Sequence, residues 1–233
     1  MRLTVFGASG GTGRWLVEQA LAAGDRVTAV TRRPASIPPR DCLSVVGADV
    51  ADADAVDATI AGSDAVLSAL GVSYSRKPIS VYSQGTTNII AAMHRHGVKR
   101  LVVVSSAPLD PAYRASDSLF FTRVMEPLFM RRPGRTTYDD MRRMESLVRA
   151  SDLDWTIIRS CWLFDAAAVT DYRLAENSAG GMFTARADLA ASMLAQLADD
   201  RFIRRVVGVT TTAGTPSIIG QIWREGITKP KRR

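Results

Sequence analysis

The stretch Met1-Arg-Leu-Thr-Val-Phe6, followed by Gly7-Ala-Ser-Gly10-Gly-Thr-Gly13, decides the fold of this chain. The short apolar run predicts a strand, and the helical spacing of apolar residues from Trp15 to Leu21 predicts a helix after the glycines. A strand, a glycine-rich turn and a helix together place free backbone N–H groups at a helix N-terminus, where partial positive charge binds a pyrophosphate. The stretch therefore predicts a dinucleotide-binding turn.

Each glycine of this turn has a physical reason. Gly7 permits the tight turn, Gly10 lets a phosphate approach the backbone, and Gly13 lets the helix pack close to the strand. The spacing is G-x-x-G-x-x-G and departs from the dinucleotide fingerprint G-x-G-x-x-G, so a glycine-rich surface loop is the alternative interpretation. The strand before the turn, the helix after it and a second strand that begins near Arg26 favour the dinucleotide site.

Length and composition bound the class of protein. The chain has 233 residues, of which 46% are hydrophobic, and this suits one domain with a sizeable core. No apolar run is long enough to span a bilayer, and a strand that starts at residue 1 leaves no room for a secretory signal. Cys42 and Cys161 lie far apart and show no metal-ligand spacing. We expect a cytoplasmic protein with free thiols, no metal and no membrane partner.

The net charge of +7 raises the question of a nucleic-acid partner. The basic residues are dispersed in short pairs and do not form one stripe, so we expect no nucleic acid and a small-molecule substrate instead. The basic tail over residues 226–233 is expected to be disordered. The oligomeric state is left open between a monomer and a homodimer.

Apolar runs that predict strands alternate with segments that predict helices along most of the chain. This alternation implies βαβ units, and therefore an α/β fold with a doubly wound parallel sheet, a single Rossmann domain with its ligand at the carboxyl ends of the strands. Further strands are expected at Arg26–Thr31, Leu43–Val46, Asp64–Leu70, Arg100–Ser105, Trp155–Ile158 and Arg205–Thr210. Further helices are expected at Asp52–Ile60, Val81–His96, Ser116–Ala150 with a break near Pro133, and Ala187–Ala198.

The end of the second strand bears on the choice of cofactor. A carboxylate at this position binds the ribose 2′-OH of NAD, whereas an arginine accommodates the 2′-phosphate of NADP. The sequence has Arg32 and Arg33 here and no acid, and guanidinium groups bind phosphate bidentately. NADP is therefore favoured over NAD, with two solvated loop arginines as the alternative.

The ends of the third and fourth strands complete the predicted cofactor site. Asp49 and Val50 offer a carboxylate and an apolar neighbour to an adenine edge, although Asp49 is also a candidate helix cap or turn residue. Ala69, Leu70 and Gly71 close the fourth strand, where little bulk lets a cofactor lie against the backbone.

Three stretches carry a resemblance to a known family: Gly7–Gly13, Arg100-Leu-Val-Val-Val-Ser-Ser106, and the segment from Met144 to Arg159. Together they resemble the short-chain dehydrogenase/reductase superfamily, in its atypical branch with NmrA-like and biliverdin-reductase-B-like (flavin reductase) proteins. The likeness covers residues 1 to about 211. Ser160 departs from it, because the family pattern usually has proline there.

The resemblance implies an NADPH-binding Rossmann domain, with substrate-side segments at about 107–150 and 160–190. The glycine turn would hold the pyrophosphate, the paired arginines the 2′-phosphate, and the ends of the later strands the nicotinamide. The loop Cys161-Trp162-Leu163 would pack near the carboxamide. The cofactor-binding residues so implied are Gly7, Ser9, Gly10, Gly11, Thr12, Gly13, Arg32, Arg33, Asp49, Val50, Ala69, Leu70, Gly71, Ser105, Cys161 and Trp162.

Candidate catalytic residues follow the fifth strand. Many enzymes of the superfamily use a Tyr-x-x-x-Lys pair, and the nearest match is Tyr138-Asp-Asp-Met-Arg142, whose i, i+4 spacing puts both side chains on one helical face. The alternative is an ordinary tyrosine near a helix start among solvated charges. Ser105 and Ser106 are the other candidates, where Ser106 or water supplies a proton and Ser105 alternatively satisfies only backbone groups.

These observations support a principal hypothesis and two alternatives. The first is an NADPH-dependent oxidoreductase that transfers hydride to a small conjugated or carbonyl acceptor, such as a flavin-like or quinone-like compound. The second is a non-catalytic NADP(H)-binding redox sensor or regulator of the NmrA type. A weaker third is an epimerase. The apolar stretch from Phe120 to Met130 is compatible with core, a substrate lid or a dimer face.

Overall fold

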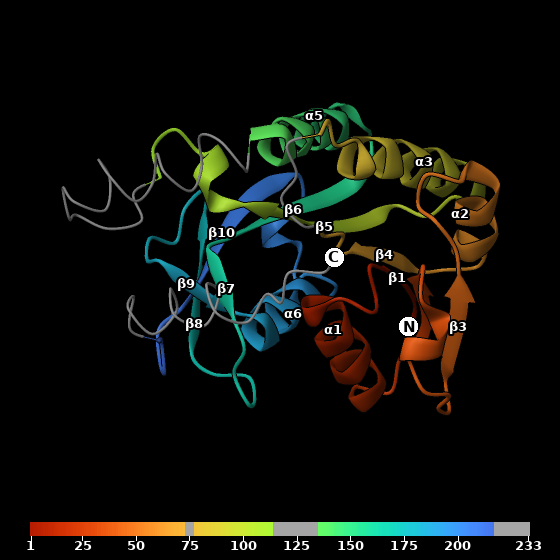
Figure 1. Ribbon diagram of the computed structural model, residues 1–233, viewed down its shortest axis with the longest axis horizontal. Helices are drawn as coiled ribbons and strands as arrows, with labels where there is room; N and C mark the ends of the chain where they lie inside the picture. Colours follow the sequence, from red (N-terminus) through yellow and green to blue (C-terminus); the bar gives the residue numbers. More distant parts are fainter. Residues whose placement is uncertain (73–76, 114–134, 217–233) are drawn as a thin grey trace.

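One eight-stranded sheet runs through the computed structural model, which describes residues 1–72, 77–113 and 135–216. All of its strands are parallel except the last edge strand, which pairs antiparallel with its neighbour (Figure 1). In spatial order they are β3 (Leu43–Gly47), β2 (Arg26–Thr31), β1 (Arg2–Phe6), β4 (Ala65–Ser68), β5 (Arg100–Ser106), β6 (Asp154–Ser160), β10 (Arg205–Thr211) and β8 (Tyr172–Glu176).

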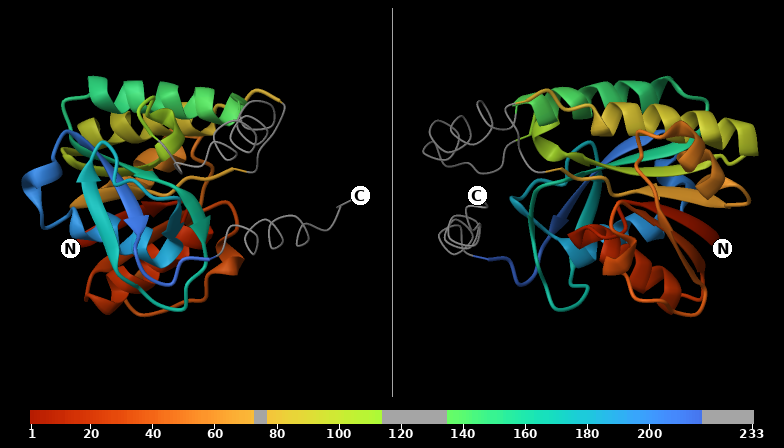
Figure 2. Two further views of the ribbon diagram at one scale, coloured as in Figure 1. Left: turned by 90° about the vertical axis from the view of Figure 1, so that its left-hand side faces the viewer. Right: turned by 45° about the vertical axis from the view of Figure 1, so that its right-hand side comes forward.

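Helices cover both faces of this sheet. On one face lie α1 (Gly11–Ala22) and α6 (Arg186–Ala195), and on the other α2 (Ala53–Ile60), α3 (Val81–His96) and α5 (Arg135–Ala150). Figures 1 and 2 show the sheet between these two helical layers. Short 3-10 helices lie between these elements: η1 (Pro34–Ser36), η2 (Ala107–Leu109) and η4 (Asp200–Phe202).

The continuous apolar strands follow from burial on both faces. In β5, Leu101 and Val103 pack among residues of α2, α3 and α5, whereas Val102 between them packs with residues of α1 and α6. Side chains alternate across a strand, so a strand buried on both faces has no polar face to present. The predicted doubly wound fold is confirmed, as a mostly parallel sheet in one Rossmann-like domain.

Helix ends are well predicted where a capping residue fixes them. Asp52 is the N-cap of α2, and its carboxylate accepts the backbone N–H groups of Asp54 and Ala55 at 3.1 Å. Gly97 ends α3 in the left-handed conformation, with φ of 68°, which favours glycine. Both boundaries therefore fall within a residue of the sequence prediction.

The segment after β6 differs most from the prediction. No strand is predicted between Trp155–Ile158 and Arg205–Thr210, but the segment contains β7 (Trp162–Phe164) and β9 (Phe183–Ala185), which pair in a small sheet, as well as the antiparallel strand β8. Strands of three residues are too short to show a period in sequence, and β8 is an edge strand with mixed burial.

Smaller differences concern element ends and residues beyond the described ranges. The fourth strand is shorter than Asp64–Leu70, and the last helix starts at Arg186 and ends at Ala195. The predictions for Phe120–Met130 and for residues 226–233 lie outside the described residues. Within the described ranges, no helix combines the length and apolar character needed to cross a membrane.

Candidate functional site

A cavity of about 680 Å³ opens at the carboxyl ends of the central strands. The sheet reverses its order between β1 and β4, because the chain runs outward from β1 through β2 to β3 and then returns to β4. Such a switch point leaves a crevice between the loops that follow the two strands. The volume lies within the usual range for ligand pockets, and residues from the ends of β1, β2, β3 and β4 line it.

The turn after β1 is packed too tightly to accept side chains. A Cβ on Gly7, whose φ is +77°, would lie 2.4 Å from the carbonyl oxygen of Ala69, and one on Gly13 would lie 2.1 Å from that of Gly7. Gly10 is the N-cap of α1, has no side chain to cap the helix, and lines the cavity with Gly11 and Thr12. The backbone N–H groups at the start of α1 are therefore placed at the cavity, as an anion site requires.

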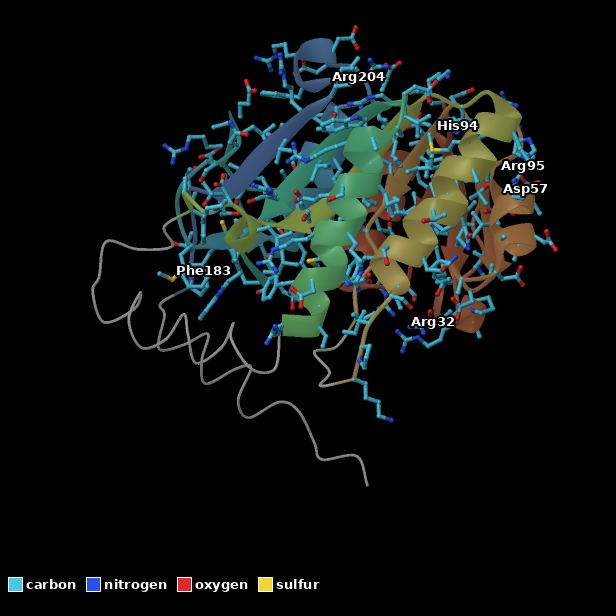
Figure 3. The ribbon with its side chains drawn as sticks, turned by 90° about the horizontal axis from the view of Figure 1, so that it is seen from above. Arg32, Asp57, His94, Arg95, Phe183 and Arg204 are labelled. Carbon is cyan, nitrogen blue, oxygen red and sulfur yellow. The ribbon has the colours of Figure 1, made fainter. Side chains whose placement is uncertain are left out.

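Arg32 and Arg33 lie at the cavity where β2 ends. Both are exposed, and neither makes an ion pair with a carboxylate of the described residues. Thr31 holds the start of this loop, because its hydroxyl donates to Ser9 Oγ at 2.7 Å and accepts the N–H of Arg33 at 3.1 Å. Figure 3 shows Arg32 far from His94, which lies toward the opposite end of the molecule.

The ends of β3 and β4 also line the cavity. Asp49 forms a local turn in which its carboxylate accepts the N–H of Ala51 at 3.0 Å. Asp49 also lines the cavity, so it combines the turn role considered in the sequence analysis with a place at the predicted site. Val50 is buried, and its carbonyl accepts the side-chain amide of Asn88 at 2.9 Å. Ala69, Leu70 and Gly71 line the other wall.

The end of β5 has a different character. Ser105 is 1% exposed and donates a hydrogen bond of 2.7 Å to Glu145 Oε1, which also accepts from Arg159 Nε at 2.9 Å. Arg159 Nη2 donates to the other oxygen of Glu145 at 2.8 Å, and its Nη1 lies 3.4 Å from Asp110. The residue that lines the cavity from β5 is Val104, while Ser105 faces α5. This buried cluster, Ser105, Glu145, Arg159 and Asp110, is called the β5 cluster below.

The electrostatics of the β5 cluster favour the ionised carboxylate. Burial acts to raise the pKa of Glu145, but the hydrogen bonds from Arg159 and Ser105 and the charge of Arg159 outweigh it. The pKa of Glu145 is therefore held below its ordinary value. A carboxylate that accepts from two guanidinium nitrogens and a hydroxyl positions its neighbours and does not serve as a ready proton donor.

Several predicted site residues do not line the cavity of the described chain: Ser105, Ser106, Tyr138, Cys161, Trp162 and Gly13. Near Tyr138, the guanidinium of Arg142 pairs with Asp139 at 2.8 Å. Cys161 is buried, which raises the pKa of its thiol, and the Trp162 ring packs edge to face on Phe183 at 6.3 Å. The catalytic or binding roles of these residues stay predictions.

Two further cavity residues, Leu163 and Arg186, come from the predicted substrate-side segment 160–190. Leu163 follows Trp162 in β7, and a strand places consecutive side chains on opposite faces. A strand of three residues is too short for this alternation to be recognised in the sequence. Of the described residues in the other predicted segment, 107–150, none lines the cavity. Nor does any group of three or more His, Cys, Asp or Glu side chains in the described chain form a potential metal site.

Comparison with known families identifies the chain at the level of its fold and ligand class. A profile of the family described as NAD(P)H-binding matches residues 7–200, which include every residue that lines the cavity except Phe6 at the end of β1. The chain belongs to this NAD(P)H-binding family. The NAD(P)H-binding family and the Rossmann fold implied by the predicted resemblance are thereby confirmed, and solved short-chain dehydrogenase/reductase structures share this fold.

Individual relatives are more distant. The chain is 36% identical over 107 residues to the uncharacterized protein Rv2047c of Mycobacterium tuberculosis, a match that spans 46% of this chain and 12% of that protein. Among solved structures it is similar to a Veillonella parvula short-chain dehydrogenase/reductase in complex with NADP, with 21% identity, a TM-score of 0.75, and 93% and 99% of the two chains covered. It is also similar to ChuY, an anaerobillin reductase of Escherichia coli O157:H7, with 23% identity, a TM-score of 0.68, and 93% and 100% covered.

Proposed function

We propose that this protein is an NADPH-dependent oxidoreductase that transfers hydride to a small conjugated or carbonyl acceptor of the flavin or quinone type. One observation carries the proposal: the cavity at the switch point joins a glycine turn at a helix N-terminus to a pair of exposed arginines at the end of β2. The first feature suits a pyrophosphate and the second a 2′-phosphate.

The residues present fit a phosphorylated dinucleotide. Side chains at Gly7 or Gly13 would clash with backbone atoms, so this turn keeps its backbone open to a ligand. In the proposal, Ser9, Gly10, Gly11 and Thr12 hold the pyrophosphate. Asp49, Val50, Ala69, Leu70 and Gly71 form the walls beside adenine and nicotinamide, and when bound, the reduced cofactor supplies the hydride.

The choice of NADP over NAD rests on charge at the end of β2. The strand ends at Thr31, whose hydroxyl is engaged by Ser9 and by the backbone of Arg33, and none of the next four residues, Arg32 to Ala35, is acidic. An acid there would also repel a 2′-phosphate. The exposed guanidinium groups of Arg32 and Arg33 favour this group instead.

For the acceptor, the protein supplies chiefly orientation. Hydride transfer to a conjugated ring system needs binding and alignment, which account for much of the rate, and a proton from water or a nearby hydroxyl completes the reduction. Ser106 and Tyr138 remain the proposed proton donors, whereas Ser105, whose hydroxyl donates to Glu145, stays a proposed site residue without that role. The reductase ChuY shares this fold, which supports an acceptor of the conjugated type.

The test is an assay of the purified full chain with NADPH and a panel of flavins, quinones and linear tetrapyrroles, followed by loss of absorbance of the reduced nicotinamide. We expect turnover with at least one acceptor, and slower turnover when NADH replaces NADPH. The variants Ser106→Ala and Tyr138→Phe are then compared with Ser105→Ala by kcat and KM, since loss of a proton donor lowers kcat. Absence of turnover with the whole panel contradicts the proposal.

One observation favours a second candidate function, an NADP(H)-binding sensor. No tyrosine–lysine pair lines the cavity in the described part of the chain, and the nearest match has its arginine paired with Asp139. A sensor requires tight cofactor binding without turnover and a partner protein that distinguishes NADP from NADPH. The same turnover assay, combined with measured dissociation constants for NADP and NADPH, separates the two functions.

A further inference from the structure

Arg186 reaches the glycine turn from a distant part of the sequence. It is the first residue of α6, which packs beside α1, and the Gln19 side chain of α1 donates to the carbonyl of Ala187 at 3.0 Å. The Arg186 side chain lies directly on Gly11, because a Cβ built on that glycine would be 2.6 Å from Arg186 Cδ and 2.7 Å from Nε. Arg186 also lines the cavity.

This contact explains why position 11 is a glycine, which the roles of the motif glycines Gly7, Gly10 and Gly13 do not. Gly11 has no positive φ, and the three atoms nearest to a Cβ built on it all belong to the Arg186 side chain. The missing side chain therefore leaves room for a guanidinium beside the first turn of α1. A cation placed there adds to the partial positive charge of the helix N-terminus, where it opposes helix stability and favours an anion.

The backbone that carries Arg186 is firmly held. Ala185, just before it, donates its N–H to Thr211 Oγ1 at 2.8 Å, and the buried carboxylate of Asp188 accepts from Thr170 Oγ1 at 2.8 Å and from Thr211 Oγ1 at 2.5 Å. These bonds join the start of α6 to the end of β10 and to the preceding loop. A binding group on such an element is pre-organised and loses little entropy when a ligand arrives.

The partner of Arg186 in the structure is exchangeable. Its Nη1 lies 2.8 Å from Asp165 Oδ1, and the Asp165 side chain is 81% exposed whereas that of Arg186 is 25% exposed. Ion pairs of this kind contribute little, because water already solvates the carboxylate well. A phosphate group at the cavity offers the guanidinium a bidentate partner of higher charge.

We propose that Arg186 is a third phosphate-binding cation. When the dinucleotide binds, the Arg186 guanidinium exchanges its ion pair with Asp165 for one with the pyrophosphate, while Arg32 and Arg33 bind the 2′-phosphate. This rests on the proposed cofactor site but not on any particular acceptor. It divides the basic residues of the cavity into two sets, one at the end of β2 and one across the glycine turn. Each set recognises a different phosphate of the same molecule.

The test measures dissociation constants by calorimetry for NADPH and for 2′-phosphoadenosine, which has the 2′-phosphate but no pyrophosphate. For Arg186→Ala we expect NADPH to bind about tenfold more weakly or worse, from the loss of a charge-assisted hydrogen bond, with 2′-phosphoadenosine unchanged. Arg186→Lys should recover part of the loss because it keeps the charge. Gly11→Ala should cause a smaller loss by displacing the Arg186 side chain.

Two controls sharpen the result. Arg14→Ala removes an exposed arginine in the first turn of α1 that does not line the cavity, and should leave NADPH binding within about twofold of wild type. Asp165→Asn removes the competing carboxylate and should tighten NADPH binding at low salt by about two- to threefold. Thermal unfolding of each variant verifies that it is folded.

The outcomes separate this inference from the proposed function. If Arg186→Ala binds NADPH as tightly as wild type does, or binds NADPH and 2′-phosphoadenosine more weakly by the same factor, the pyrophosphate role of Arg186 is wrong while the reductase proposal stands. If wild type binds NADPH and no acceptor is reduced, the reductase proposal fails and the Arg186 comparison still decides the inference. If wild type does not bind NADPH, both are overturned.

Discussion

The phosphate-facing side of the cavity and the β5 cluster use charge in opposite ways. At the glycine turn and the end of β2, backbone N–H groups and exposed arginines lie at the cavity. In the β5 cluster, Glu145 and Arg159 are buried against each other, and the Ser105 hydroxyl donates a hydrogen bond to Glu145. The positively charged groups of the first region are available to a ligand, whereas the charges of the second region are paired with each other inside the protein.

This difference teaches where function and stability lie in the fold. A helix N-terminus and solvated guanidinium groups cost little to keep without a ligand, so substitutions there should alter binding before folding. A buried ion pair depends on its partner, because a single buried charge is strongly destabilising. Substitutions in the β5 cluster should therefore alter folding first.

The largest expected effect comes from Glu145→Ala. It leaves the guanidinium of Arg159, which is 8% exposed, without its principal partner, and such losses cost about 3–5 kcal/mol. We expect this decrease in the free energy of unfolding in urea denaturation. A decrease below about 1 kcal/mol would erase the contrast between the two regions.

Acid sharpens the same comparison. Since the pKa of Glu145 in the folded protein is below the ordinary value of 4.5, its ionised form stabilises the fold above pH 4.5, and this contribution is lost as the pH falls through the folded-state pKa. Glu145→Gln removes this dependence. The difference in unfolding free energy between wild type and Glu145→Gln should therefore narrow as the pH falls from 7 to 3, and a constant difference would contradict the assignment.

The next effect comes from Gly13→Ala at the glycine turn. The new Cβ would stand 2.1 Å from the backbone oxygen of Gly7, so α1 must move, with an expected loss of about 1–3 kcal/mol in stability and loss of measurable NADPH binding. Gly71→Ala is the matched control for stability. Its Cβ meets nothing within 4 Å, and the stability should stay within about 0.5 kcal/mol of wild type.

The smallest effect is expected for Arg32→Ala combined with Arg33→Ala. Both side chains are exposed and form no ion pair in the described chain, so the stability should be unchanged. NADPH should bind about tenfold more weakly, which is a loss of about 1.4 kcal/mol of binding free energy. NADH, which lacks the 2′-phosphate, serves as the control ligand and should bind equally to both proteins. A parallel loss for NADH would mean that the pair does not read the 2′-phosphate.

The predictability of each part follows from the range of the interactions that fix it. The turn from Gly7 to Gly13 and the helix end at Gly97 are local, and glycine spacing and capping reveal them directly. The interactions that fix the strand β7 are not local. It is held by pairing with β9, about twenty residues later, and three residues carry too short a pattern to be recognised.

The site shows the same division. Arg32 follows a clear strand, so its place at the cavity is predictable from the strand end alone. Ser105 is predicted at the same edge, but whether its side chain faces the cavity or α5 depends on Glu145, forty positions later in the chain. Arg186 gives no local signal, since a lone arginine after a short strand resembles any surface residue.

By itself, the sequence determined the α/β layering, the dinucleotide turn and the basic end of β2, because each is encoded by neighbours along the chain. Only the tertiary structure decided that Ser105 donates its hydroxyl to Glu145 and that Arg186 lies over Gly11. These contacts depend on how α5 and α6 pack on the sheet. Packing joins residues that are far apart in sequence, and no local pattern records which of them will meet.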